Sequence, residues 1–329
     1  MHPVGEVRKD YLLDRYVIIA SERGKRPHEF AQHTAIPIAS APSKKTCVFC
    51  PGQESKTPDA VLCINDAKGN WRMRAFPNKF GAMHPEGNAQ IRTDNTFFTF
   101  SNNFGYAEVL VETPQHGKEL ADLPVEDIST VLRLYQERIT ALAAKEGVRY
   151  VTAFKNSGGA AGTSLEHSHS QIIAFNHNPR IVEREVEACH RYAMDKPEGA
   201  CAYCDLIAIE NQSYRRCFEN DAAVAFTPYA SRFPFELWIF PKRHVHSLIN
   251  LTDVERQGIA ELLSSALKRL KTINAPYNYY LHHAPTGDDL HFHIELTPRT
   301  EIWAGFELST ETIINVLSPE DAAKFYRGE

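Results

Sequence analysis

The chain has 329 residues, of which 43% are hydrophobic and 23% are charged, which excludes a disordered or fibrous protein and predicts two compact domains. Its net charge of −5 supplies no general basic field, so we expect no nucleic-acid partner. The N-terminal residues do not resemble a secretory signal, and no apolar stretch is long enough to span a bilayer, so we expect a cytoplasmic protein with no membrane partner.

The first chemically informative motif along the chain is a Cys-x-x-Cys turn at Cys47 and Cys50. Where thiols are kept reduced, such a pair is typical of a metal clip or a redox motif rather than a disulfide. Two thiolates from one short turn and two histidines from distant segments form a common tetrahedral zinc shell. The pair therefore predicts a zinc site, with a redox pair or two buried thiols as the alternative.

Residues 108–116 and 236–244 resemble one another, and each segment ends in a histidine. Both are followed by apolar residues at helical spacing, which predicts helices over residues 125–145 and 253–271, with Asp122 and Thr252 near their starts. Both halves of the chain are therefore predicted to contain the same order of strand, turn and helix, which indicates an internal duplication.

A glycine-rich loop from Asn156 to Ser164 precedes the segment His167-Ser-His-Ser-Gln171. Backbone amides of such a loop can approach phosphate oxygens closely. Alternate residues of a strand share one face, so His167 could hold a metal while His169 meets a phosphate and Gln171 donates an amide hydrogen bond. A neutral imidazole is a good nucleophile near pH 7, so we predict attack on phosphorus by His169. The alternative is a pair of core or metal-binding histidines.

Candidate metal ligands recur in the same order in both halves. The two predicted sets are Cys47, Cys50, His116 and His167 in the first half, and Cys201, Cys204, His244 and His291 in the second. Four protein ligands close the shell of the first set, so its metal is predicted to be structural. The second half ends in His291-Phe-His293, without a glycine-rich approach or a following glutamine, so we expect only the first half to be chemically active.

Residues 180–200 contain a charged run followed by Asp-Lys-Pro-Glu-Gly, which favours a connector. We therefore predict an N-terminal catalytic domain over residues 1–185 and a C-terminal domain over residues 186–329. The fold class that follows is α+β, with two tandem domains that each contain an antiparallel sheet in the form of a half-barrel with packed helices.

Together these motifs resemble the galactose-1-phosphate uridylyltransferase family of the histidine-triad superfamily. The resemblance spans nearly the whole chain and also rests on residues 8–20 and 22–27, on Phe76-Pro-Asn-Lys-Phe80, on Gly305-Phe-Glu307 and on residues 318–323. It implies two domains of histidine-triad type and a homodimer. It also implies a double displacement in which His169 attacks UDP-glucose, expels glucose 1-phosphate and passes UMP to a second sugar phosphate, while Gln171 stabilises the phosphoryl oxygens.

The resemblance also implies a substrate-binding set. Its predicted members are Arg23, Arg26, Asn78, Asn156, Gly158, Gly159, Gly162 and Ser164. The two arginines would reach a phosphate-bearing site from the neighbouring subunit, whereas the alternative for them is a solvated basic turn.

Several departures from the family pattern leave alternatives open. Ser168 stands where many members have proline, and Glu301 and Ile313 stand where enterobacterial members have lysine and glutamine, so the acceptor stays open. The chain is also similar to the plant-type ADP-glucose phosphorylase branch, which delivers AMP to inorganic phosphate; a histidine-triad hydrolase is a further alternative. The second metal could be zinc or iron, and Glu185, His282, His291 and His293 form a competing ligand set.

Overall fold

The computed structural model describes residues 5–25 and 46–329, and its central element is a ten-stranded sheet in the order β10-β11-β12-β14-β13-β8-β9-β7-β4-β3. The strands are β3 (Leu62–Asn65), β4 (Trp71–Pro77), β7 (Gly105–Val111), β8 (Tyr150–Ser157), β9 (His169–Phe175), β10 (Arg216–Glu219), β11 (Ala223–Phe226), β12 (Leu237–Pro241), β13 (Tyr277–His282) and β14 (His293–Pro298). Every neighbouring pair in this sheet is antiparallel, which confirms the α+β prediction.

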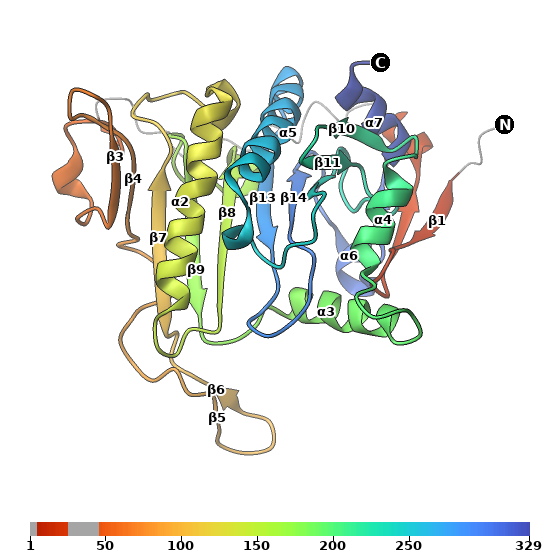
Figure 1. Cartoon of the computed structure of the whole chain (residues 1–329), viewed down its shortest axis with the longest axis horizontal. Coiled ribbons are helices and arrows are strands. Elements are labelled where there is room, and N and C mark those ends of the chain that lie inside the picture. The colour runs from red at the N-terminus through yellow and green to blue at the C-terminus, as the bar shows by residue number, and fades with distance from the viewer. Residues whose placement is uncertain (1–4, 26–45) are drawn as a thin grey trace.

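The strand order repeats between the two halves of the chain. The first half contributes β3-β4-β7-β9-β8 and the second contributes β10-β11-β12-β14-β13, and the halves meet where β8 pairs with β13. Both halves thus share one continuous sheet (Figure 1). The division into two domains at residue 185 stays a prediction.

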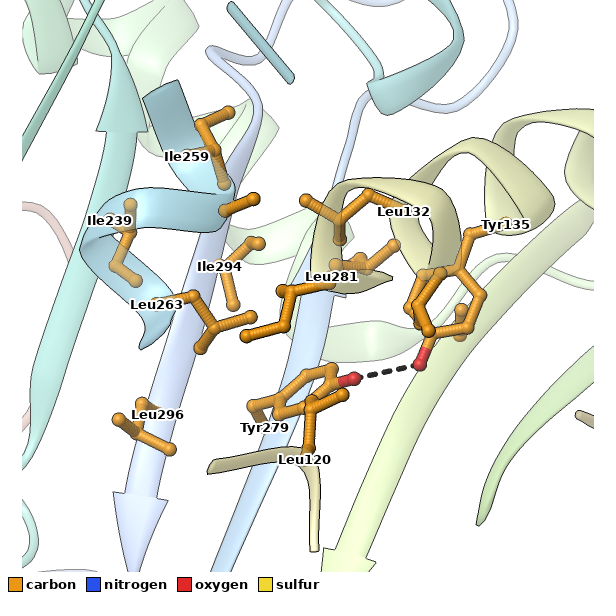
Figure 2. Close-up of a cluster of buried hydrophobic side chains, with 14 of the residues drawn as sticks. Leu120, Leu132, Tyr135, Ile239, Ile259, Leu263, Tyr279, Leu281, Ile294 and Leu296 are labelled. Carbon is orange, nitrogen blue, oxygen red and sulfur yellow. Dashed lines mark hydrogen bonds between the residues drawn. The ribbon is translucent and has the colours of Figure 1, made fainter. Parts of the chain in front are cut away.

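Helices α2 (Val125–Ala143) and α5 (Asp253–Thr272) lie side by side against one face of the sheet (Figure 1). Both predicted helices are confirmed, and the side chain of Thr252 caps α5 by accepting a hydrogen bond from the backbone amide of Glu255. Asp122 instead ends a short 3-10 turn ahead of α2. Figure 2 shows the apolar core between these helices and the strands, where the hydroxyls of Tyr135 and Tyr279 lie 2.7 Å apart.

The opposite face is covered over the second half of the sheet by α3 (Arg180–Ala193) and α4 (Ala202–Glu210). Val186 of α3 and Tyr203 of α4 belong to the same buried cluster as Trp238 and Phe240 of β12. The Cys47–Cys50 turn packs on this face in the first half, against Phe76, Val109 and Val111.

The remaining elements lie around the sheet. A small sheet joins β1 (Glu6–Lys9), β2 (Tyr16–Ile19) and β15 (Ile313–Asn315), and α6 (Gly305–Thr310) and α7 (Pro319–Arg327) flank β15 in the chain. A hairpin of β5 (Arg92–Thr93) and β6 (Thr99–Phe100) projects from the body (Figure 1). Within the described ranges, no helix is both long and apolar enough to cross a membrane.

Candidate functional site

His169 begins β9 and pairs with Val111 of β7, while Gln171 pairs with Val109 of β7 and Phe154 of β8. The two predicted catalytic side chains therefore share one face of the sheet, opposite α2 and α5. His169 is buried, and its Nδ1 lies 2.8 Å from the carbonyl oxygen of His167. A carbonyl only accepts hydrogen bonds, so Nδ1 carries the proton and Nε2 keeps its lone pair.

The protonation state of His169 is set by its surroundings. Burial and the positive charge of Lys155 lower the pKa of its imidazole below the ordinary value. The ring is therefore neutral at pH 7, and Nε2 is available as a nucleophile.

A buried ion pair lies directly beneath the nucleophile strand. Lys155 of β8 donates to Glu112 Oε2 at 2.7 Å, to Ser168 Oγ at 3.0 Å and to the carbonyl oxygen of His169 at 3.1 Å. Ser168 Oγ donates to the same carboxylate at 2.7 Å, so this serine points away from the reactive face. Sequence reasoning missed this ion pair, because 43 residues separate Lys155 from Glu112 and no sequence pattern links them.

Cys47, Cys50, His116 and His167 form the first predicted metal set, and their ligand atoms all lie within 4.8 Å of one another. His167 Nδ1 lies 3.5 Å from Cys47 Sγ, while Cys50 Sγ lies 3.4 Å from His116 Nδ1. His167 Nε2 donates to the Thr113 carbonyl at 2.7 Å, which leaves its Nδ1 lone pair facing the thiols. Two thiols and two imidazoles, each with its Nδ1 near a thiol, fit zinc.

Phe49 connects this metal set to the nucleophile. It lies inside the Cys47–Cys50 turn, and its ring centroid is 5.3 Å from that of His169 in an edge-to-face arrangement. The same ring contacts His167 and Phe76, with centroids 6.2 and 5.7 Å away. A metal that fixes the turn would therefore also fix one wall around His169. In the sequence, the position of Phe49 between Cys47 and Cys50 is the pattern that could have indicated this contact with His169.

The glycine-rich loop turns sharply between β8 and β9. Gly158 and Gly162 have φ values of 86° and 83°, which other residues rarely adopt, and a Cβ at Gly158 would come within 2.8 Å of Pro276. Gly158, Gly159 and Asn156 line a cavity of about 230 Å³ together with His169. Gly162 and Ser164 belong to the same loop without lining that cavity.

Asn156 is held in one orientation by the second half of the chain. Asn278 of β13 pairs with Asn156 and donates through Nδ2 to Asn156 Oδ1 and to the Ala161 carbonyl, both at 2.8 Å. The carbonyl end of Asn156 is thereby occupied, so its amide NH₂ is left as a donor. Continuing the β8–β9 register places Asn156 opposite His169.

The other predicted substrate residues lie farther from His169. Asn78 donates through its backbone amide to the Ala107 carbonyl, four residues along β7 from the partner of His169, or about 13 Å at the usual rise of a strand. Arg23 lines a separate cavity of about 160 Å³ with Glu301 and Trp303. Ile313 is buried in the small sheet, and Arg26 lies outside the described residues.

The second predicted metal set is also assembled. Cys204 Sγ lies 3.4 Å from His244 Nδ1 and 3.5 Å from His291 Nδ1, and Cys201 completes the group. His291 Nε2 donates to the Pro241 carbonyl at 2.9 Å, which repeats the arrangement of His167. This set also fits zinc. The competing set is only partly brought together, since Glu185, His282 and His293 group with Glu295 and not with His291.

His293 occupies the position in the second half that His169 has in the first. Its Nδ1 donates to the His291 carbonyl at 3.0 Å, but the side chain is fully buried. The rings of Tyr203 and Phe240 lie 5.1 and 4.8 Å from it, and Glu295 stands where the first half has Gln171. This histidine is therefore closed to a substrate.

Comparisons with known proteins agree with these features. The family model for the N-terminal domain of galactose-1-phosphate uridyl transferase matches residues 2–179, and a model for a domain of unknown function matches residues 113–325. An ADP-glucose phosphorylase of Arabidopsis thaliana is 31% identical over 98% of this chain and 92% of its own length. A galactose-1-phosphate uridylyltransferase of Thermotoga maritima is 26% identical over 98% of both chains.

Solved structures show the same relationship. The crystal structure of an ADP-glucose phosphorylase from Arabidopsis thaliana with bound ADP-glucose superposes with a TM-score of 0.84 at 30% identity, covering 99% of each chain. A structure described as a uridylyltransferase superposes with a TM-score of 0.74 at 27% identity, over 98% of this chain and 97% of the other. The chain therefore belongs to the galactose-1-phosphate uridyl transferase family.

Proposed function

We propose that this nucleotidyltransferase moves a uridylyl group from UDP-glucose to a hexose 1-phosphate such as galactose 1-phosphate, through a covalent intermediate on His169. The observation that carries the proposal is the fixed tautomer of His169. Its Nδ1 proton is held by the His167 carbonyl, so Nε2 presents a lone pair on the face shared with Gln171.

The reaction has two steps that balance without a further reactant. In the first, the Nε2 lone pair forms a bond to the α-phosphorus, and the bond from that phosphorus to the bridging oxygen breaks, so its electron pair leaves with the sugar phosphate. In the second, an oxygen of the acceptor phosphate attacks the same phosphorus and the electron pair of the P–N bond returns to Nε2. The Nδ1 proton stays on His169 throughout, and the amide donors of Gln171 and Asn156 stabilise the phosphoryl oxygens.

Zinc is the metal that we propose for both Cys₂His₂ sets, with iron as the alternative for the second. When bound, it would supply a rigid clamp and no reactive water, because four protein ligands close its shell. In the first half Cys47 and Cys50 would then hold Phe49 against His169.

Adenylyl transfer from ADP-glucose to inorganic phosphate is the second candidate. It is favoured by the 31% identical phosphorylase and by the residues at positions 301 and 313. Glu301 brings a carboxylate to that cavity, and Ile313 is buried, so neither offers a donor to a sugar phosphate. Both candidates use the same nucleophile and differ in base and acceptor.

We also propose a cytoplasmic homodimer, in which Arg23 and Arg26 of one subunit approach the phosphate site of the other. Support comes from the projecting β5–β6 hairpin. Its exposed apolar side chains are Ile91, Phe97, Phe98 and Phe100, which is the kind of surface that a second subunit would cover.

The direct test is the intact mass of the protein after mixing with UDP-glucose or ADP-glucose without acceptor. We expect one UMP or AMP adduct per chain, absent in His169→Ala and retained in His190→Ala, which removes an exposed histidine. Adding galactose 1-phosphate or inorganic phosphate should discharge the adduct and identify the acceptor. Rapid nucleotide release to water without either acceptor would instead indicate a hydrolase, and no adduct with any nucleotide sugar would refute nucleotidyl transfer through His169.

A further inference from the structure

A cleft of about 290 Å³ lies on the same face of the sheet as the nucleophile, over the neighbouring strands. It is lined by Asn156 of β8, Asn278 of β13 and Thr297 of β14, together with Arg299, Phe233 and Trp303. The register aligns Thr297, Asn278 and Asn156 in one row across neighbouring strands, and the next residue in that row is His169. The row places Thr297 about 14 Å from His169, since neighbouring strands are about 4.8 Å apart.

Arg299 is the unusual side chain in this cleft. Its Nε is buried without a hydrogen-bond partner, and within the described ranges no carboxylate pairs with its guanidinium. Its guanidinium lies over the ring of Phe233, 5.1 Å from the centroid, and that ring stacks on Trp303 at 4.9 Å. Burial lowers the pKa of Arg299, but an arginine remains charged at any physiological pH.

A second arginine in the same cleft, Arg232, has its positive charge balanced by carboxylates of the protein. Arg232 pairs with Glu236 at 2.7 Å and also contacts Glu295 and the Tyr280 hydroxyl. Its charge is therefore balanced inside the protein. Arg299 has no such balance, and a half-buried cation without a counter-ion is stabilised by an anionic ligand.

The position of the cleft relative to His169 indicates which part of the substrate it meets. Asn78, predicted to bind the nucleotide, lies toward β4, whereas the cleft lies on the other side of His169, over β8, β13 and β14. A substrate whose α-phosphorus lies at His169 would therefore extend its leaving group into the cleft. The acceptor must enter by the same route, because it attacks the phosphorus from which the leaving group departed.

We propose that Arg299 and the amide NH₂ of Asn156 bind the phosphate monoester dianion that leaves in the first step and enters in the second. This inference rests on the proposed function and adds a subsite to it. The ligand is inorganic phosphate or the phosphate of a sugar 1-phosphate, since both present the same oxygens to a planar guanidinium. The subsite is supplied by this subunit and is separate from the cavity of Arg23.

Equilibrium binding of inorganic phosphate and of galactose 1-phosphate, measured by calorimetry on the metal-loaded protein, tests the subsite without requiring catalysis. We expect Arg299→Gln to weaken the preferred ligand about 100-fold and Arg299→Lys to weaken it about 10-fold, because lysine keeps the charge and loses the planar fork. Arg191→Gln, which removes an exposed arginine of α3, serves as the matched control and should bind like the wild type. Equal phosphate affinity in Arg299→Gln and wild type would overturn the proposal.

Formation and discharge of the nucleotidyl adduct distinguish a failure of this proposal from a failure of the proposed function. Arg299→Gln should still form the adduct on His169 when nucleotide sugar is saturating, and water should discharge it at the wild-type rate. The acceptor concentration that gives half-maximal discharge should rise about 100-fold. An unchanged half-maximal concentration would reject the role of Arg299 while leaving nucleotidyl transfer intact. If no adduct forms in the wild type, nucleotidyl transfer fails, and the calorimetry decides the subsite independently.

Discussion

Replacing Lys155 with methionine would leave the carboxylate of Glu112 inside the protein without its cation. Both side chains are at most 1% exposed, so bulk water cannot solvate the remaining charge. The substitution also removes the hydrogen bond from Lys155 to the carbonyl oxygen of His169. Lys155→Met therefore tests both the stability of the sheet and the placement of the nucleophile.

The expected loss can be worked out from these contacts. Breaking a buried ion pair by removing one partner costs about 3–5 kcal/mol. A stranded carboxylate can instead take up a proton, and neutralising a glutamate of ordinary acidity at pH 7 costs about 3.7 kcal/mol, at about 1.4 kcal/mol for each pH unit above 4.3. At pH 5 the same cost is about 1 kcal/mol. Folded Lys155→Met then carries a proton on Glu112 that the unfolded chain lacks. Its loss of unfolding free energy relative to the wild type therefore grows as the pH rises.

Urea unfolding of the wild type, Lys155→Met, Glu112→Gln and the double variant at pH 5 and pH 7 provides the measurement. We expect Lys155→Met to lose about 4 kcal/mol at pH 7 and clearly less at pH 5, and the double variant to recover most of the loss. A deficit below about 1 kcal/mol at pH 7, or one that does not shrink at pH 5, would refute the reasoning from the buried pair.

Three further predictions concern the site itself. Cys47→Ser should remove one bound metal per chain, measured by elemental analysis, and should lower kcat at least about tenfold because Phe49 loses its support. Cys201→Ser should also remove one metal, with little change in kcat. Unchanged metal content in either variant would contradict the ligand set that contains the replaced cysteine. Asn278→Ala should lower kcat about 10-fold to 100-fold in steady-state assays, with a smaller effect on KM, since Asn156 loses its orientation, and wild-type kcat would count against that role. The rate of adduct formation in rapid-quench experiments should fall to half of its maximum at a pH below 6.5, because the pKa of His169 is lowered and only the neutral ring attacks. A half-maximal rate at pH 7 or above would contradict the assigned environment.

Local sequence patterns were sufficient to predict the α+β class, the helices α2 and α5 and both Cys₂His₂ groupings. These features depend on helical periodicity, on a short cysteine turn and on strand alternation, which are visible within a few residues or through the repeat. The alternation of His167, His169 and Gln171 predicted one shared face for the same reason.

The features that the sequence did not reveal depend on pairing between distant strands. Lys155 of β8 meets Glu112 at the end of β7 because β9 lies between these two strands, and Asn278 meets Asn156 because β13 pairs with β8. Nothing near Arg299 in the sequence indicates that its guanidinium is left without a carboxylate. The continuous sheet was likewise not predicted, since a repeat is equally compatible with two separate sheets.

The seam between β8 and β13 has a consequence for how the chain could be divided. The connector between α3 and α4 runs over residues 194–201, where Met194 is 76% exposed, so a protease can reach it while the seam stays buried. A cut there would leave two fragments joined by backbone hydrogen bonds along the seam and by the packing of α2 on α5. Co-expressed halves should reassemble into a working enzyme, while the N-terminal fragment alone, without the amide of Asn278, would lack the support for its own active site.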